Sequence, residues 1–298
     1  MAECASTPTP DTYLRILASG SSGNCSVLIH RTAEGKRRVW MIDAGLSPRR
    51  TTMLLRAMGV TLADIEGLFL THLDTDHWCP SWRSALPRNV AVRVHDAHAR
   101  DFAHLAGETG RALTFDQPIS LGDGVEVSPV LAAHDEEGAA VFRFHFPRGS
   151  LGFATDIGQA TTSLISHLRG VDVLAIESNY CPVMQKASPR PAFLKQRIMG
   201  GHGHLSNQQS AAATRAIAPR SHVVLLHLSR QCNLPALAAR EHGGAQYRVT
   251  IASQHSPTPW VPIAGAPPGE MPVSDRQSLF VTGVGSATSI APAGTPSP

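Results

Sequence analysis

Four side chains that can bind a metal ion or transfer a proton lie in one short segment, His72-Leu73-Asp74-Thr75-Asp76-His77. The apolar residues 67–70 directly before it predict a buried strand. At a strand exit, side chains two residues apart can point to the same side. Packing alone rarely produces such a cluster, because unpaired buried carboxylates cost several kcal/mol. The segment therefore predicts a metal site, and the alternative is that these side chains only cap a helix and bind backbone N–H groups.

Three further polar side chains follow apolar runs elsewhere in the chain. His134 follows residues 130–133, Asp156 ends residues 151–156, and His227 follows residues 223–226. Each alone is typical of an ordinary strand end. Together they bring the candidate metal ligands to a number that suits a pair of divalent ions with a bridging water. The candidate ligands are His72, Asp74, Asp76, His77, His134, Asp156 and His227.

The composition favours a globular protein that handles metal. The chain has 298 residues, of which 42% are hydrophobic, 16% are charged and 15 are histidine. No apolar run reaches the roughly 18 residues of a membrane helix, and the first residues do not resemble a signal peptide. The five cysteines are scattered, which argues against a disulfide framework. We therefore expect a cytoplasmic protein without a membrane partner; the sequence leaves its oligomeric state open.

Charge is distributed unevenly along the chain. Between Ser178 and Arg240 there is no Asp or Glu, but there are eight Lys and Arg residues. The simple interpretation is a solvated basic surface. A long segment of one sign also favours anionic ligands such as phosphate chains.

The sequence predicts one folded domain between two disordered ends. Residues 1–11 are polar and predict a disordered lead, residues 12–253 predict the domain, and residues 254–298 predict a largely disordered tail rich in Pro, Gly and Ser. Ser47-Pro48 and Gly59 predict the start and the end of a helix. Ser206 and Gln209 predict a capping box at the start of another helix. Two groups of strands interrupted by helices predict an α/β fold with helices outside two packed sheets.

The ordered set of motifs resembles the metallo-β-lactamase-fold hydrolases, and within them the YycJ/WalJ-like branch. His-x-Asp-x-Asp-His followed by His134, Asp156 and His227 is similar to the metal motifs of that family. The branch is suggested by further motifs in the expected order, namely Leu17-Ala18-Ser19-Gly20-Ser21-Ser22-Gly23-Asn24, Ile42-Asp43-Ala44-Gly45, Thr155-Asp156-Ile157-Gly158, Ile176-Glu177-Ser178-Asn179, Gly203-His204-Leu205-Ser206-Asn207 and Leu226-His227-Leu228-Ser229. The resemblance implies a four-layer αββα sandwich and a metal-dependent phosphodiesterase that acts as a DNA exonuclease.

The resemblance also implies roles for individual residues. One metal ion would be held by His72, Asp74 and His134, the other by Asp76, His77 and His227, with Asp156 bridging them. Asp76 and Asp156 would orient an attacking water, and His204 would donate a proton to the leaving group or, alternatively, only support a ligand.

The expected metal depends on one position. The family implies two zinc ions, but Asp74 stands where it usually has histidine. Because hard oxygen ligands favour manganese or iron, the metal could be one of these instead.

The predicted substrate contacts come from two segments. Residues 179–201 should border the cleft and contact the phosphate backbone of DNA through Lys186, Arg190, Lys195 and Arg197. Ser21 and Asn24 lie in a Gly-rich turn that could meet a phosphate or be a plain turn. Two other functions stay open: hydrolysis of a small ester, lactone or cyclic phosphodiester, and metal-dependent binding without catalysis.

Overall fold

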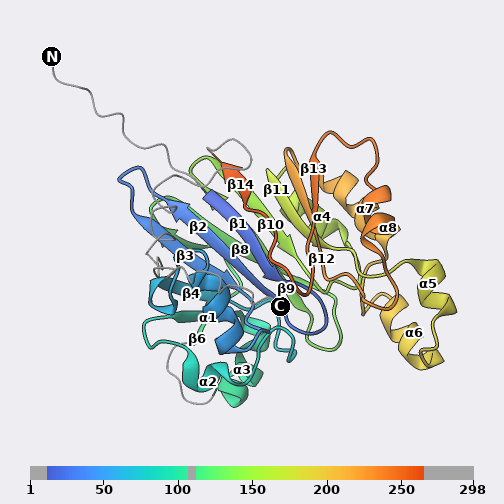
Figure 1. Cartoon of the computed structure of the whole chain (residues 1–298), viewed down its shortest axis with the longest axis horizontal. Helices are drawn as coiled ribbons and strands as arrows, with labels where there is room; N and C mark the ends of the chain where they lie inside the picture. Colours follow the sequence, from blue (N-terminus) through green and yellow to red (C-terminus); the bar gives the residue numbers. More distant parts are fainter. Residues whose placement is uncertain (1–11, 107–111, 265–298) are drawn as a thin grey trace, which may run out of the picture.

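Two seven-stranded β-sheets pack face to face at the centre of the molecule (Figure 1). The computed structural model describes residues 12–106 and 112–264. The first sheet has the order β14-β1-β2-β3-β4-β5-β6, and the second has the order β13-β12-β11-β10-β9-β8-β7. The strands are β1 (Thr12–Ala18), β2 (Cys25–Arg31), β3 (Arg37–Ile42), β4 (Ile65–Phe69), β5 (Ala91–His95), β6 (Ala112–Phe115), β7 (Ile119–Gly122), β8 (Val125–Ala132), β9 (Ala139–Phe146), β10 (Gly149–Ala154), β11 (Val173–Glu177), β12 (His222–Leu226), β13 (Arg248–Ile251) and β14 (Val261–Ala264).

Helices cover the outer face of each sheet. The α-helices are α1 (Pro48–Arg56), α2 (Trp82–Ala85), α3 (Ala99–Ala106), α4 (Thr162–Leu168), α5 (Pro182–Ala187), α6 (Ala192–Met199), α7 (Asn207–Ile217) and α8 (Pro235–Arg240), and the short 3-10 helices are η1 (Leu62–Asp64) and η2 (Asp96–His98). Helices α1, α2 and α3 pack on the first sheet, whereas α4, α7 and α8 pack on the second. This arrangement confirms the predicted αββα sandwich. None of the helices within the described ranges is long and apolar enough to cross a membrane.

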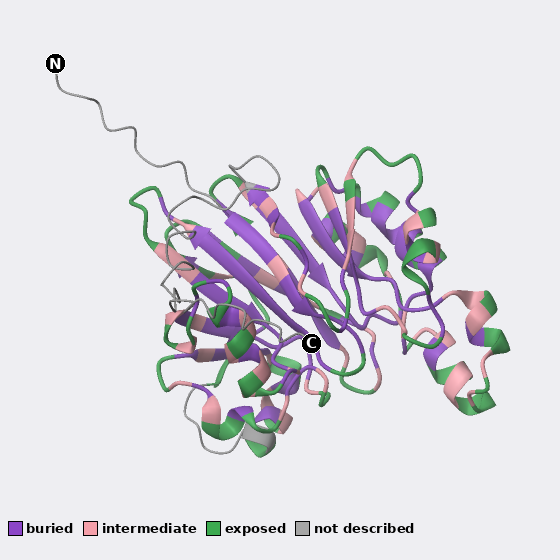
Figure 2. Cartoon of the chain, viewed as in Figure 1, coloured by how far each residue is buried: buried purple, intermediate pink, exposed green. Residues whose placement is uncertain are grey.

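Strand residues alternate between an inner and an outer core. In β2, Leu28 faces the core between the two sheets, while Val27 and Ile29 face the core under the helices. Successive side chains of a strand point to opposite faces, so a strand in a middle layer must be apolar on both. Buried residues accordingly fill both sheets in Figure 2.

Local signals at two helix starts are confirmed. The Ser47 side chain accepts a hydrogen bond from the Arg50 backbone N–H at 3.4 Å, and Pro48 is the first residue of α1. Ser206 and Gln209 form the predicted capping box at α7. These caps satisfy backbone N–H groups that have no partner inside the helix.

The predicted end of the domain at residue 253 is wrong. Residues 254–264 are part of the fold, and β14 pairs antiparallel with β1. Val261 and Ile263 are buried in the core between the sheets, and the hydroxyl of Thr258 accepts a hydrogen bond from the Ile16 N–H at 3.1 Å. The prolines nearby suggested disorder, but proline is tolerated in an edge strand such as β14. The predicted disordered residues 1–11, and residues 265–298 of the predicted tail, lie outside the described residues.

Several elements were not predicted from the sequence. Strands β6 and β7 and helices α5, α6 and α8 are short, and the longest of them has eight residues. The periodicity of such short elements is too weak to distinguish from a loop. Two of them, α5 and α6, form the segment that was expected only to be a basic border of the cleft.

Strand direction brings one end of many strands to the same edge. Strands β10, β11 and β12 are mutually parallel. Strand β8 runs in the same direction, because β8 and β10 are both antiparallel to β9, which lies between them. In the first sheet, β3 and β4 are also parallel. The loops after these strands therefore meet, which is where an α/β fold usually binds its ligands.

Gly45 allows two of these loops to touch. A Cβ atom at this position would lie 1.7 Å from the backbone oxygen of Asp76, a distance that no real contact allows. We expect Gly45→Ala to lower the free energy of unfolding by about 3 kcal/mol or more, because the backbone has to move. Urea denaturation measures this loss. Gly243→Ala is the control, with its nearest foreign atom at 3.3 Å and an expected change within about 0.5 kcal/mol. Equal midpoints for the two variants would contradict the prediction.

Candidate metal centre

The segment that follows β4 is held rigidly by backbone hydrogen bonds. The Asn24 N–H donates to the Asp76 carbonyl at 2.7 Å, and the Ala44 N–H donates to the His77 carbonyl at 2.8 Å. The imidazole rings of His72 and His77 lie side by side, with centroids 4.0 Å apart. The turn thus presents its polar side chains to one place, as the sequence predicted.

The polar residues after the strands of the second sheet meet this turn. Asp156 Oδ2 lies 3.1 Å from His77 Nε2, and Asp156 Oδ1 lies 2.9 Å from His227 Nδ1. The ring centroids of His134 and His72 are 4.9 Å apart. Asp156 and His227 both have φ of 52°, a left-handed conformation that is uncommon outside glycine and tends to occur at functional sites. The turn at residues 72–77 and three residues from distant parts of the chain, His134, Asp156 and His227, therefore converge.

The seven candidate ligands fall into overlapping groups. The ligand atoms of His72, Asp74 and His134 all lie within 4.8 Å of one another, and so do those of Asp76, His77 and His227. Asp156 reaches both groups, because it also lies within this distance of His72 and His77. The structure thus brings together all seven residues in the two sets that the resemblance implied.

Burial makes this cluster a strong cation site. His72, His77, Asp156 and His227 are almost completely buried. Burial lowers the pKa of His72 well below its usual value. Burial also opposes a charge on His227, but the nearby Asp156 carboxylate outweighs it and raises the pKa of His227 to about 10. The buried carboxylates thus favour a positive charge on neighbouring imidazole groups such as His227. A divalent cation that binds these imidazoles would displace their protons.

Two buried ring nitrogens in the cluster, Nε2 of His72 and Nε2 of His227, have no well-formed hydrogen bond within the described residues. A carboxylate oxygen lies near each, with Asp74 Oδ2 3.8 Å from His72 Nε2 and Asp76 Oδ2 3.4 Å from His227 Nε2. Buried polar atoms without a hydrogen bond are rare in proteins, and an imidazole nitrogen facing a carboxylate suits a shared ion. The imidazole and carboxylate groups around these atoms are the donors that zinc, manganese and iron prefer.

His77 is fixed from behind by a residue that the sequence analysis did not assign a role. Its Nδ1 atom lies 2.8 Å from Oδ2 of the buried Asp43. The Thr71 hydroxyl and N–H both donate to Oδ1 of Asp43, at 2.9 Å each. A carboxylate on one ring nitrogen sets the tautomer and orients the other nitrogen toward a metal. Asp43 belongs to the motif Ile42-Asp43-Ala44-Gly45, which was recognised only as part of a resemblance.

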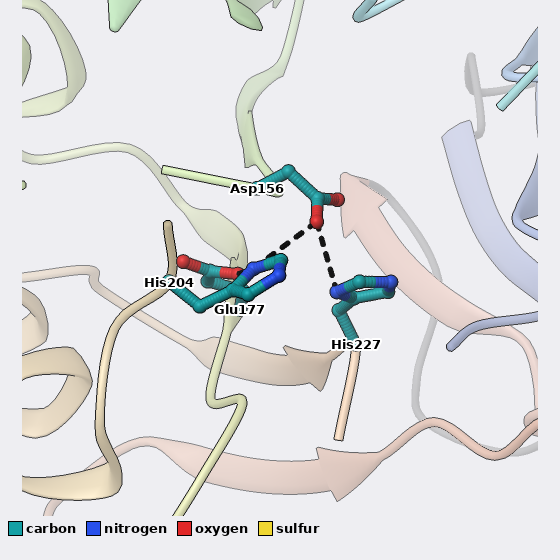
Figure 3. Close-up of side chains that lie close together, drawn as sticks. All are labelled: Asp156, Glu177, His204 and His227. Atoms are coloured by element: carbon teal, nitrogen blue, oxygen red, sulfur yellow. Dashed lines mark hydrogen bonds and ion pairs between the residues drawn. The ribbon is translucent and has the colours of Figure 1, made fainter. Parts of the chain in front are cut away.

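His204 is held in the same way by a second unassigned carboxylate (Figure 3). Its Nδ1 atom lies 3.1 Å from Oε2 of Glu177 and 3.2 Å from Oδ1 of Asp156. Glu177 is fully buried, and its other oxygen accepts hydrogen bonds from the backbone N–H groups of Leu205 and Ile157. Nε2 is then the His204 ring nitrogen that these carboxylates leave available. The sequence signal for Glu177 was its place at the end of an apolar strand.

A cavity of about 410 Å³ opens beside the cluster. Asp74, Asp76, His134, Asp156, His204 and His227 line it, together with Ser21, Arg190 and Arg197 among the predicted substrate contacts. Three other predicted substrate contacts are not on this wall.

Two of those three side chains, Asn24 and Lys195, bind elsewhere in the protein. Asn24 is buried, and its amide lies 2.9 Å from His77 Nε2, so it supports the cluster rather than facing a substrate. Lys195 donates to the Lys186 carbonyl at 2.7 Å on the exposed side of α5 and α6. Asn24, Lys186 and Lys195 thus do not line the cavity, because spacing along the chain does not determine which way a side chain points. A contact between the two lysines and a phosphate backbone outside the cavity stays a prediction.

Comparison with known proteins identifies the family. A family model described as the β-lactamase superfamily domain matches residues 37–228. The chain belongs to this superfamily. It is 28% identical to the exodeoxyribonuclease YycJ of Bacillus anthracis over 235 residues, which cover 76% of this chain and 86% of that protein. It is a hydrolase of the metallo-β-lactamase fold.

Two solved structures share the fold. The metallo-β-lactamase-fold protein YhfI from Bacillus subtilis superposes with a TM-score of 0.62 and 16% identity, covering 84% of this chain and 99% of YhfI. A diphosphatase from the PhnP family superposes with a TM-score of 0.59 and 17% identity, covering 86% of this chain and 100% of that one. The family implies divalent metal ions, and the buried imidazole nitrogens and converging carboxylates of this chain fit such ions.

Asp43 provides a test of the metal centre that does not depend on activity. We expect Asp43→Asn to weaken metal affinity about 10- to 100-fold, because the amide cannot hold His77 in the same tautomer. Titration of the metal-free protein against a chromophoric chelator measures the change. Asp123→Asn is a matched control, since Asp43 and Asp123 share a left-handed backbone with φ of 59° and 52°, but Asp123 pairs with Arg38 on the surface. Equal affinities for both variants would rule out this role.

Proposed function

We propose that this hydrolase is a metal-dependent exonuclease that acts on DNA. Its similarity to a protein named as an exodeoxyribonuclease supports a nucleic acid substrate, and the cluster and its cavity supply the groups that phosphodiester hydrolysis needs. The proposal rests on one observation above all: two arginines stand on the wall of the cavity that contains the candidate ligands.

The proposed ligand sets follow the two groups in the cluster. His72, Asp74 and His134 would hold one divalent ion, and Asp76, His77 and His227 the other, with Asp156 between them. Zinc is expected from the family. Asp74 adds an oxygen donor, which favours manganese or iron as alternatives.

Residues of the chain would position the reacting groups. When bound, the two ions would neutralise phosphate charge and make a water molecule acidic. Asp76 and Asp156 would orient that water. His204 would donate a proton to the departing oxygen from Nε2, while Glu177 holds its Nδ1.

Arg190 carries a charge that is available to a phosphate. Among the residues that the structure describes, its guanidinium donates only to neutral acceptors, the side chains of Gln231, Gln185 and Ser229, at 3.2 to 3.4 Å. Arg197 lies on the same wall and pairs with Asp135, with Nε 2.9 Å from Oδ1. An arginine without a carboxylate partner next to a hydrolytic centre is suited to hold the substrate backbone.

A second cavity next to the centre is acidic, which favours attack at a strand end. It has a volume of about 680 Å³ and shares Asp74, His134, Asp135 and Arg197 with the first cavity, whereas Asp101, Glu136 and Glu137 line only the second. A hydrogen bond that the protonated Glu137 carboxyl donates to Asp101, followed by burial and the negative charges of Asp101 and Glu136, raises the pKa of Glu137 to about 7. A polyanion would approach from the arginine side and stop at the centre, because continuing would bring phosphates against carboxylates.

A substrate panel tests the activity. We expect the metal-loaded protein to degrade linear DNA and to spare covalently closed circular DNA, because its substrate path ends at the centre. The panel compares linear single strands, linear duplexes, circles, RNA and a nitrophenyl ester, each with zinc and with manganese, by gel and absorbance. Asp156→Ala should reduce hydrolysis to background, since Asp156 reaches both ligand groups. Cleavage of circles would contradict exonuclease action, and activity on the ester alone would favour the small-substrate alternative.

Arg190 provides a test of nucleic acid contact. We expect Arg190→Gln to lower the slope of log affinity against log salt concentration by about one, because one phosphate contact is lost. Fluorescence anisotropy with a labelled oligonucleotide at several salt concentrations measures the slope. Arg220→Gln is the control, because Arg220 is exposed at the opposite edge of the sheet and pairs with Asp172. If the two variants gave the same slope as the unsubstituted protein, the contact at Arg190 would be excluded.

A further inference from the structure

Helices α5 and α6 form a small unit that stands out from the sandwich (Figure 1). The unit has its own apolar cluster, in which Met184 of α5 and Leu194, Ile198 and Met199 of α6 pack around Tyr180 and Cys232. Most of its remaining surface is exposed or half-buried in Figure 2. The unit therefore does not need its outward side chains for packing.

One of those outward side chains is a phenylalanine. Phe193 is 75% exposed, whereas its neighbours on α6, Leu194 and Ile198, point into the apolar cluster. It makes no ring contact with another aromatic side chain within the described residues. Leaving a large apolar ring in water gives no folding benefit, so packing does not explain the residue at this position.

Phe193 lies next to the arginines of the cavity wall. It is four residues before Arg197 on α6, and residues with this spacing are neighbours on a helix surface. Arg190 precedes it by three residues, at the turn that leads into the helix. Both arginines line the cavity of the candidate centre. The ring is therefore next to Arg197 on the surface of α6 without lining the cavity itself, so a strand that reaches Arg197 from outside can pass it.

Charge indicates the kind of ligand. Lys186, Arg190, Lys195 and Arg197 lie in the unit, and there is no Asp or Glu between Ser178 and Arg240. Proteins that bind single-stranded nucleic acid combine such a positive path with aromatic rings on which bases stack. A duplex offers no free base face along its length, but an unpaired end does.

We propose that Phe193 is a stacking platform for an unpaired base, which directs the end of a single strand past Arg190 and Arg197 to the metal centre. The proposal rests on the proposed nuclease function and makes its substrate class more specific. Phe193 acts on specificity and does not touch the reacting atoms. The strand is held by two separable contacts, a base on the ring and phosphates on the arginines.

An abasic strand separates the two contacts, because it keeps the phosphates and lacks the bases. We measure the binding of short phosphorothioate oligothymidylate and of its abasic counterpart to the metal-loaded protein by fluorescence anisotropy. The normal strand should bind about 5- to 150-fold more tightly than the abasic strand. Phe193→Ala should abolish this difference, Phe193→Trp should restore it, and KM for a cleavable strand should rise in Phe193→Ala with kcat unchanged.

Val183→Ala is the matched control, because Val183 is equally exposed, at 75%, on α5 of the same unit. The platform is overturned if the unsubstituted protein binds both strands equally, if Phe193→Ala keeps the difference, or if Val183→Ala loses it to the same extent. A protein that cleaves DNA with any of these results keeps the nuclease function without the platform, and the exposed ring is then available to a protein partner. Failure of the nuclease function is read separately, from the substrate panel, since the binding comparison needs no cleavage.

Discussion

The buried carboxylate of Asp156 is the constraint on which the site depends. It is 2% exposed, and the imidazoles of His77, His204 and His227 surround it at 2.9 to 3.2 Å. A buried charge is tolerated only when opposite charge and hydrogen bonds compensate it. The chain does so by ending β10 and β12 in left-handed residues that turn their side chains toward one another. The same cluster offers imidazole and carboxylate atoms that a divalent cation could bind.

Carboxylates behind the cluster keep the imidazoles in place. Asp43 contacts Nδ1 of His77, and Glu177 contacts Nδ1 of His204. Neither carboxylate lines the cavity, so both orient their imidazole ring from the side of the protein interior. Glu177 in turn accepts backbone N–H groups from two loops and links β11 to the start of α7. The geometry of the centre is therefore a property of the rigid sheet edge rather than of flexible loops.

The surroundings of the centre are electrically asymmetric. Arg190 lines only the first cavity, and Asp101, Glu136 and Glu137 line only the second. Arg197 and Asp135 pair between the two cavities, where the two kinds of surface meet. Such a distribution of charge favours one direction of approach for a polyanion, and this preference does not depend on base sequence.

The sequence by itself determined the sandwich, the helix caps at Ser47 and Ser206, and the seven candidate ligands, because hydrophobic periodicity and closely spaced polar residues at strand ends are local signals. It could not determine that residues 254–264 close the first sheet, since β14 is defined by its pairing with β1. Nor could it separate Arg190 and Arg197 from Lys186 and Lys195, or find the support that Asp43 and Glu177 provide. Those distinctions depend on the direction of side chains and on contacts between residues far apart in the chain, which only the tertiary structure decides.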